Sequence, residues 1–192
     1  SVDIELRDSM LQTKHFVYST SQSSVTHLRK TLLAPALHAC FGEVTAQDLE
    51  WIDVHDKKKG VRVKESVQTE GHALLFVCLK GSASDQFKLK AAFGFMTSDS
   101  TRYDGLQRAP GVPLIQILIG SHECNQGLTF LRLQHIHILE PNPKGWGKVI
   151  QTIGRGVRRG THTGLDSRFC TVHTTIYLTT LELGSGSSLQ KY

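Results

Sequence analysis

Short apolar runs alternate along the chain with stretches in which apolar residues recur at helical spacing. The apolar runs, rich in β-branched and aromatic residues, occupy positions 15–19, 72–81, 114–121, 133–141 and 169–181. Between them, apolar residues three or four positions apart predict amphipathic helices, including one at 85–95 and one around 149–157. Strands that alternate with helices in this way form a mainly parallel sheet covered by helices on both faces. We therefore expect an α/β fold.

The first helix is expected after the strand at 15–19 and a short polar loop. Its apolar positions follow helical spacing at Val25, Leu28, Leu32, Leu33 and Leu37. Gly42 is predicted to close this helix, since glycine readily adopts the backbone conformation that ends helices.

Alternating valines around the sequence DKKKG predict a hairpin at 51–67. The lysines of its turn, 57–59, are interpreted first as solvated charges, with contact to nucleic acid as the alternative.

Composition places the chain among soluble globular proteins, because 39% of its residues are hydrophobic and 20% are charged. No apolar run reaches the roughly 20 residues that span a bilayer, and no signal-peptide pattern begins the sequence. We expect one domain at 1–183, a flexible Gly/Ser-rich tail at 184–192, no membrane association and an intracellular location. The net charge of +5 favours a polyanionic partner.

Neither cysteines nor histidines predict a metal site. Cys40, Cys78, Cys124 and Cys170 lack the close pairing of zinc ligands, so we expect reduced and mostly buried thiols. Two of the ten histidines, at 135 and 137, share one face of a strand, but no third ligand follows from the sequence.

The stretch QTIGRGVRRGTH, residues 151–162, belongs to a predicted helix. Asn142 is a suitable N-cap and Pro143 a suitable first residue for it. Val149, Ile153 and Val157 repeat every four residues, so we expect them to form one stripe against the sheet.

On a second face of the same helix, Gln151, Arg155 and Arg158 follow i, i+4, i+7 spacing. Gly154 and Gly156 each cost about 1 kcal/mol in a helix interior relative to alanine. We interpret them as positions where another group approaches the backbone closely. A solvated basic face is the simpler alternative, but it needs neither glycine. A dinucleotide-binding loop is disfavoured, since its glycines precede a helix instead of ending one.

With QTIGRGVRR the sequence resembles motif VI of superfamily 2 helicases, Q-x-x-G-R-x-x-R. HFVYSTS resembles motif IV, and LIQILIGSHECNQGLTF resembles motif V, with Ser121 at the end of its strand and Gly127 six residues later. The three motifs occur in the family's order, and the resemblance covers about residues 12–180. The progression from HILEP through motif VI looks most like that of the NTPases and early-transcription helicases of large cytoplasmic DNA viruses.

The resemblance implies a RecA-like three-layer domain, the second of two lobes that close on ATP. The first lobe holds the phosphates and Mg²⁺, while motif VI of the second supplies arginines. By position, Arg158 is the implied arginine finger, Arg155 a second contact to the γ-phosphate or to the first lobe, and Gln151 a polar group near the nucleotide or its attacking water.

Further nucleotide contacts are implied at Gly127, Thr129 and Gly154. Related helicases usually carry Asp or Asn at the position of Thr129, so the ribose contact there is weakened.

The strand ends of motifs IV and V imply contacts to a nucleic-acid backbone. These are Ser19, Thr20, Gly120 and Ser121, with helix capping as the structural alternative for the two serines.

The sequence lacks the G-x-x-x-x-G-K-[ST] and D-E-x-[HD] motifs of a first lobe. We therefore expect an ATP-dependent helicase or translocase to which this chain contributes the second lobe, inactive by itself. The implied partners are the first lobe, nucleic acid (DNA rather than RNA) and viral RNA polymerase or transcription factors, in host cytoplasm or virion. A non-enzymatic RecA-like scaffold is the main alternative, and a nucleotide-dependent oxidoreductase is a distant third.

Overall fold

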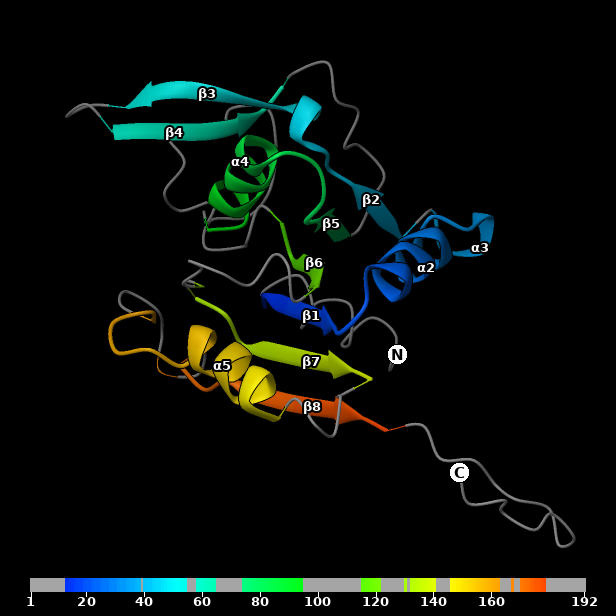
Figure 1. Ribbon diagram of the computed structural model, residues 1–192. Coiled ribbons are helices and arrows are strands. Elements are labelled where there is room, and N and C mark those ends of the chain that lie inside the picture. Colours follow the sequence, from blue (N-terminus) through cyan, green and yellow to red (C-terminus); the bar gives the residue numbers. More distant parts are fainter. Residues whose placement is uncertain are drawn as a thin grey trace, which may run out of the picture.

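The computed structural model shows an α/β domain built on a six-stranded sheet in which all strands run parallel (Figure 1). It describes residues 13–38, 40–54, 58–64, 74–94, 115–121, 130, 132–140, 146–162, 167 and 170–178. In sheet order the strands are β2 (Phe41–Glu43), β5 (Leu74–Cys78), β6 (Ile117–Ser121), β1 (His15–Ser19), β7 (His135–Leu139) and β8 (His173–Tyr177). The RecA-like fold class expected from the sequence is confirmed.

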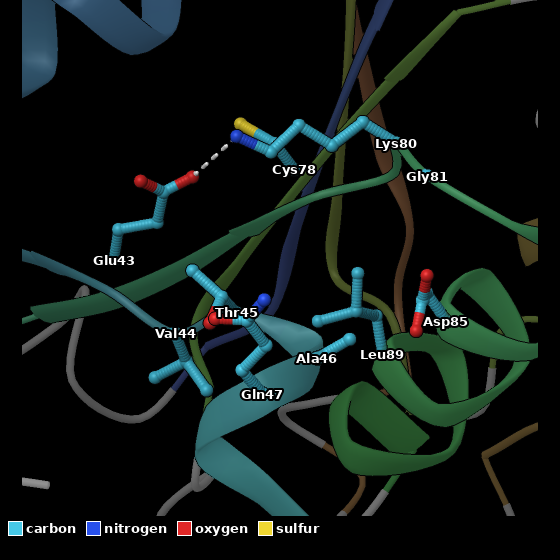
Figure 2. Close-up of a pocket in the computed structure, with 10 residues that line it drawn as sticks. All are labelled: Glu43, Val44, Thr45, Ala46, Gln47, Cys78, Lys80, Gly81, Asp85 and Leu89. Carbon is cyan, nitrogen blue, oxygen red and sulfur yellow. Dashed lines mark ion pairs between the residues drawn. The ribbon is translucent and has the colours of Figure 1, made fainter.

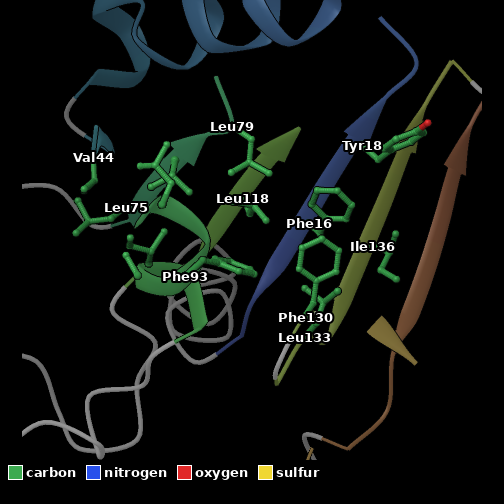
Figure 3. Close-up of a cluster of buried hydrophobic side chains, with 14 of the residues drawn as sticks. Phe16, Tyr18, Val44, Leu75, Leu79, Phe93, Leu118, Phe130, Leu133 and Ile136 are labelled. Carbon is green, nitrogen blue, oxygen red and sulfur yellow. The ribbon is translucent and has the colours of Figure 1, made fainter. Parts of the chain in front are cut away.

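Helices lie on both faces of this sheet and complete three layers. On one face, α2 (Gln22–Leu32) packs Val25 against Phe76 and Ile119, and the short α3 (Pro35–His38) follows it. On the other face, α4 (Ala83–Gly94) and α5 (Trp146–Gly156) contribute to the larger core. Figure 3 shows that core, in which Phe93 of α4 and Phe130 lie beside Phe16 of the central strand.

The central strand β1 joins the two halves of the sheet. It pairs with β6 and β7, and the register aligns His15 with Ile117 on one side and with His135 on the other. Two buried glutamines tie the amino ends of the strands together. The side-chain carbonyl of Gln134 accepts from Lys14 N at 2.8 Å, and that of Gln116 accepts from Leu75 N at 2.9 Å.

Gly42 does not close the first helix; it lies within strand β2. The helix ends earlier, with Leu33 as its C-cap. Pro35 explains the break, because a proline disfavours helical backbone at the residue before it. The apolar spacing continues to Leu37 only because a separate short helix, α3, follows. The three-residue strand β2 is not predicted by the sequence pattern.

A two-stranded antiparallel sheet of β3 (Leu49–Val54) and β4 (Lys58–Val63) occupies the stretch with alternating valines. A turn of 3-10 helix, η1 (Ala46–Asp48), precedes it, and the Asp48 carboxylate accepts from Thr45 N at 2.7 Å. The hairpin packs along α4, at the β2 end of the sheet and far from α5 (Figure 1). Leu49 and Val61 are its buried anchors.

Cys40, Cys78 and Cys170 are free, but only Cys78 is buried, so the expectation of mostly buried thiols is wrong for the other two. Cys124, Asn142 and Pro143 lie outside the described residues. No helix in the described ranges is long and apolar enough to cross a membrane.

Replacing Gln134 with methionine is expected to lower the free energy of unfolding by about 1–3 kcal/mol. The substitution keeps the side-chain volume but leaves the buried Lys14 N–H without its acceptor. Urea denaturation measures the change. Gln47→Met, at an exposed position, is the matched control and should stay within about 0.5 kcal/mol of the parent. Equal effects of the two substitutions would contradict a role for the buried amide.

Candidate nucleotide and nucleic-acid interface

Helix α5 is held on the sheet by a narrow buried face. Val149, Thr152 and Gly156 are buried, and Ile153 packs against the core. A Cβ added at Gly156 would lie 2.8 Å from Leu133 Cδ2, a distance that real Cβ atoms essentially never show, and 3.1 Å from Ile136 Cδ1. Glycine at 156 therefore lets the last turn of the helix contact the amino end of β7 directly.

The predicted stripe is wrong at Val157, which is 58% exposed beyond the end of α5. The helix ends at Gly156 instead. Gly156 is therefore the last residue of the buried face, and the apolar residue after it, Val157, does not belong to that face. The close approach inferred for both glycines holds at Gly156 alone. Gly154 is exposed, and a Cβ there would meet nothing within 4 Å.

Two of the three residues assigned to the catalytic face lie on one side of α5. Gln151 is exposed and Arg155, one turn later, is partly buried. Arg158 lies beyond the helix, which ends at Gly156, so the i+7 helical register predicted for it is wrong. Its guanidinium is positioned by a turn and not by the helix.

That turn is tied to the loop that leads into β7. Thr161 Oγ1 donates to Arg158 O at 2.7 Å, and Arg132 N donates to Thr161 O at 2.8 Å. His162 Nε2 donates to Leu133 O at 2.7 Å. These hydrogen bonds anchor the turn that carries Arg158 to the segment just before β7. No sequence motif pointed to a role for Thr161 or His162, the last two residues of the stretch 151–162.

A separate hydrogen bond anchors the end of the helix itself. Phe130 N donates to Arg155 O at 3.1 Å. Phe130 belongs to the main core, where its ring lies 4.4 Å from that of Phe16. The carbonyl of Arg155 is therefore held by a residue that is itself fixed in the core.

The strand-end residues are brought together, as the motifs imply. Ser19 of β1 aligns with Ser121 of β6, and Gly120 with Tyr18. Ser19 and Ser121 are 2% and 0% exposed, and their hydroxyls form hydrogen bonds with residues at the start of α2. Ser19 Oγ accepts from Ser21 N at 3.2 Å, and Ser121 Oγ donates to Gln22 Oε1 at 3.0 Å. The N-cap of α2 is Ser21, not Ser19.

An acidic residue, Glu140, closes the same edge next to β1. Its carbonyl accepts from Thr20 Oγ1 at 3.1 Å, and its carboxylate accepts from Ser24 Oγ at 2.7 Å. Its φ of 51° places it in the left-handed region that few non-glycine residues adopt. Glu140 thus occupies a strained position at the edge where phosphate contacts were expected, and the sequence analysis did not identify it.

The two sets of predicted residues lie at opposite ends of the sheet. Gly156 contacts the amino end of β7, whereas Ser19 aligns with Leu139 at its carboxyl end. The predicted nucleotide contacts Gly127 and Thr129 lie outside the described residues. The structure therefore brings together Gln151 with Arg155, and separately Ser19 with Thr20, Gly120 and Ser121.

A hollow of about 320 Å³ opens at the carboxyl ends of β2 and β5 (Figure 2). Glu43 at its rim pairs with Arg29, at 2.6 Å from Nε to Oε1, and with Lys80 at 3.6 Å. Burial raises the pKa of Cys78 to about 12, and the nearby Glu43 carboxylate adds to this, so the thiol stays protonated. With Asp85 as a second carboxylate in the lining, the hollow does not favour a phosphate group.

Histidines stack across β1, β7 and β8 on the same face of the sheet as α2. The ring centroids of His15 and His135 are 4.4 Å apart, and those of His135 and His173 are 5.4 Å apart. His15 Nδ1 and His137 Nε2 are hydrogen-bonded at 3.1 Å. No group of three or more His, Cys, Asp or Glu within the described ranges has a geometry that could hold a metal ion. The imidazole rings therefore pack against one another across the three strands.

Burial, together with the neighbouring rings of His135 and His137, lowers the pKa of His15 from 6.5 to about 3. Burial also lowers the pKa values of His135 and His137. In the folded protein these three imidazoles therefore resist protonation as the solution becomes mildly acidic.

No family model and no solved structure matches the chain. Two curated proteins are similar to parts of it. An uncharacterized helicase of killer plasmid pGKL-2 from Kluyveromyces lactis is 37% identical over 59 residues, 31% of this chain. A putative ATP-dependent RNA helicase of Acanthamoeba polyphaga mimivirus is 35% identical over 81 residues, 41% of this chain. The chain is therefore distantly similar, over part of its length, to helicases.

The relationship is distant and partial. The matched segments amount to 10% of the length of the plasmid helicase and 7% of the mimivirus protein. The matching part of this chain accordingly corresponds to a small part of those proteins.

The glycines of α5 are expected to respond oppositely to alanine. Gly156→Ala should lower the free energy of unfolding by about 1–3 kcal/mol, because the new methyl group would overlap Leu133. Gly154→Ala should raise it by about 0.5–1 kcal/mol, since alanine favours helix and the added methyl meets open space. Thermal and urea unfolding measure both. A stabilised Gly156→Ala protein would contradict the close packing of α5 on β7.

The unfolding free energy is expected to fall by about 2 kcal/mol between pH 7 and pH 5 through His15 alone. Below its ordinary pKa of 6.5 the unfolded imidazole takes up a proton that the folded one excludes down to about pH 3. Acid therefore favours the unfolded chain. His15→Phe should flatten this slope in urea titrations at several pH values, whereas His27→Phe, at an exposed position of α2, should leave it unchanged.

Proposed function

We propose that this chain is the second lobe of an ATP-dependent nucleic-acid helicase or translocase, supplying arginines to an ATP site shared with a first lobe. The observation that carries the proposal is the placement of Arg158. It is exposed in a turn that follows α5 and that Thr161 ties to the loop before β7. The distant similarity to helicases and the parallel sheet support the same assignment.

The chemistry follows from what phosphoryl transfer needs. Charge develops on the γ-phosphate and leaving oxygens, and a pre-positioned guanidinium stabilises it with a planar pair of donors. An exposed arginine on an anchored backbone suits this role, because the backbone does not have to become ordered when the lobes close. In our proposal Arg158 contacts the γ-phosphate, the partly buried Arg155 contacts the γ-phosphate or the first lobe, and Gln151 lies near the attacking water. Mg²⁺ and the phosphates would be held mainly by the first lobe.

The proposed nucleic-acid contact at the strand ends is centred on Thr20. It is partly exposed, whereas the hydroxyls of Ser19 and Ser121 are buried and hold the start of α2. The two serines then act by positioning the segment that includes Thr20. One similar protein is named as an RNA helicase, so both DNA and RNA belong in the assays.

Arg158→Ala in the full-length parent protein is expected to lower nucleic-acid-stimulated ATP turnover by about 10³-fold or more, the range associated with arginine fingers. Nucleotide binding should change little, because the first lobe holds most of the phosphate contacts. Arg158→Lys should recover only part of the rate, since lysine keeps the charge but loses the planar fork. Steady-state ATPase assays with single-stranded and duplex DNA and RNA measure the effect.

Arg159→Ala is the matched control, because Arg159 is the next exposed arginine of the same turn. Normal turnover in Arg158→Ala would overturn the assignment of the finger. Absence of ATPase activity in the parent itself would favour the non-enzymatic scaffold instead.

A further inference from the structure

Two aromatic side chains form an exposed pair where the β3–β4 hairpin meets α4. Trp51 of β3 and Phe87 of α4 have ring centroids 5.7 Å apart and ring planes inclined by 35°. Trp51 is 37% exposed and Phe87 is 64% exposed. The anchoring of the hairpin does not account for this exposure, because Leu49 and Val61 are its buried contacts to the core.

The hairpin that carries Trp51 is rich in basic residues. From 57 to 64 the sequence reads KKKGVRVK, with five Lys or Arg and no acidic residue, and β4 lies within it. Register pairs Glu50 with Arg62 and Asp53 with Lys59 across the hairpin. Two of the three basic residues of β4 thus lie opposite acids of β3, and the third, Lys58, lies opposite Val54.

The position of the pair in the fold places it near the carboxyl edge of the sheet. Helix α4 begins shortly after the carboxyl end of β5, and Phe87 lies four residues from the helix start, about 6 Å along its axis. The strand-end residues Ser19, Thr20 and Ser121 lie at the same edge of the sheet. An extended ligand that follows this edge can therefore contact both the aromatic pair and the strand-end residues.

We propose that Trp51 and Phe87 form a stacking platform for unpaired bases of a single-stranded nucleic acid, with the basic hairpin neutralising its phosphates. Every base has an aromatic face, so such a platform binds without sequence preference. Duplex DNA hides these faces within its stacked pairs, so the platform discriminates against it. The inference rests on the nucleic-acid binding proposed above. It adds a site for the bases, distinct from the proposed contacts between the strand ends and the nucleic-acid backbone.

Fluorescence tests the platform directly, because the chain has two tryptophans, Trp51 and Trp146. In the Trp146→Phe background, all tryptophan emission comes from Trp51. Titration with an oligothymidylate or oligouridylate of about 16 nucleotides, the upper site size of one single-strand-binding fold, should quench this emission. Raising the salt concentration should weaken binding steeply. A duplex of the same length should neither quench Trp51 nor compete at similar concentration.

Phe87→Leu in the same background is expected to weaken binding by about 5- to 100-fold, the loss that accompanies removal of one stacked base. Leucine keeps an apolar side chain at this exposed position, so circular dichroism and the thermal midpoint should be unchanged. Phe87→Tyr should restore the affinity, because it restores the aromatic face. In the Trp51→Phe protein, oligonucleotide binding followed by anisotropy should persist without quenching of Trp146.

Two results would overturn the platform: unaltered affinity in Phe87→Leu, or saturation by single strands without quenching of Trp51. The second result would assign the aromatic pair to a protein partner. Neither measurement involves ATP turnover, so failure of the platform and failure of the arginine-finger assignment are distinguished.

Discussion

The pairing of β1 with both β6 and β7 is the constraint on which the rest of the domain depends. It joins segments more than 100 residues apart, aligning His15 with Ile117 and with His135. Because the three strands are parallel and in register, their carboxyl ends meet at one edge and their amino ends at the other. Buried amide side chains reinforce the amino ends, where Gln134 accepts from Lys14 N. The strand-end residues Ser19 and Ser121 lie at the carboxyl edge, and the last turn of α5 packs at the amino edge.

The amino edge receives the end of α5, and glycine makes that contact possible. Gly156 lets the helix meet Leu133 and Ile136 without an intervening side chain. The chain then turns, and Thr161 and His162 bind back to the backbone near β7. The backbone of this arginine-bearing segment is consequently held in place, with Arg158 exposed and Arg155 partly buried. That combination suits a domain that must meet phosphate groups brought by another domain.

The carboxyl edge combines a closed part and an open part. The hydroxyls of Ser19 and Ser121 are internal, and Glu140 adds a carboxylate beside them. Towards the other end of the sheet, the β3–β4 hairpin adds Trp51 beside Phe87. Contacts to a long ligand would then be distributed along this edge. The serines Ser19 and Ser121 would position the middle of the edge, and the exposed Trp51 and Phe87 would lie at one side. The hairpin stands apart from α5, so changes there leave the arginine-bearing turn intact (Figure 1).

The sequence by itself determined the order and type of most elements, because buried strands and amphipathic helices impose local apolar patterns. It located β1 at His15–Ser19, the hairpin, and the Gln151–Arg155 face of α5. It could not locate β2, since three residues carry too little pattern, nor the end of α5, since Val157 continued the apolar spacing. Only the tertiary structure decided that Gly156 closes against β7, and that the serine hydroxyls turn inward. Those outcomes depend on contacts between residues distant in sequence, whose geometry no local pattern encodes.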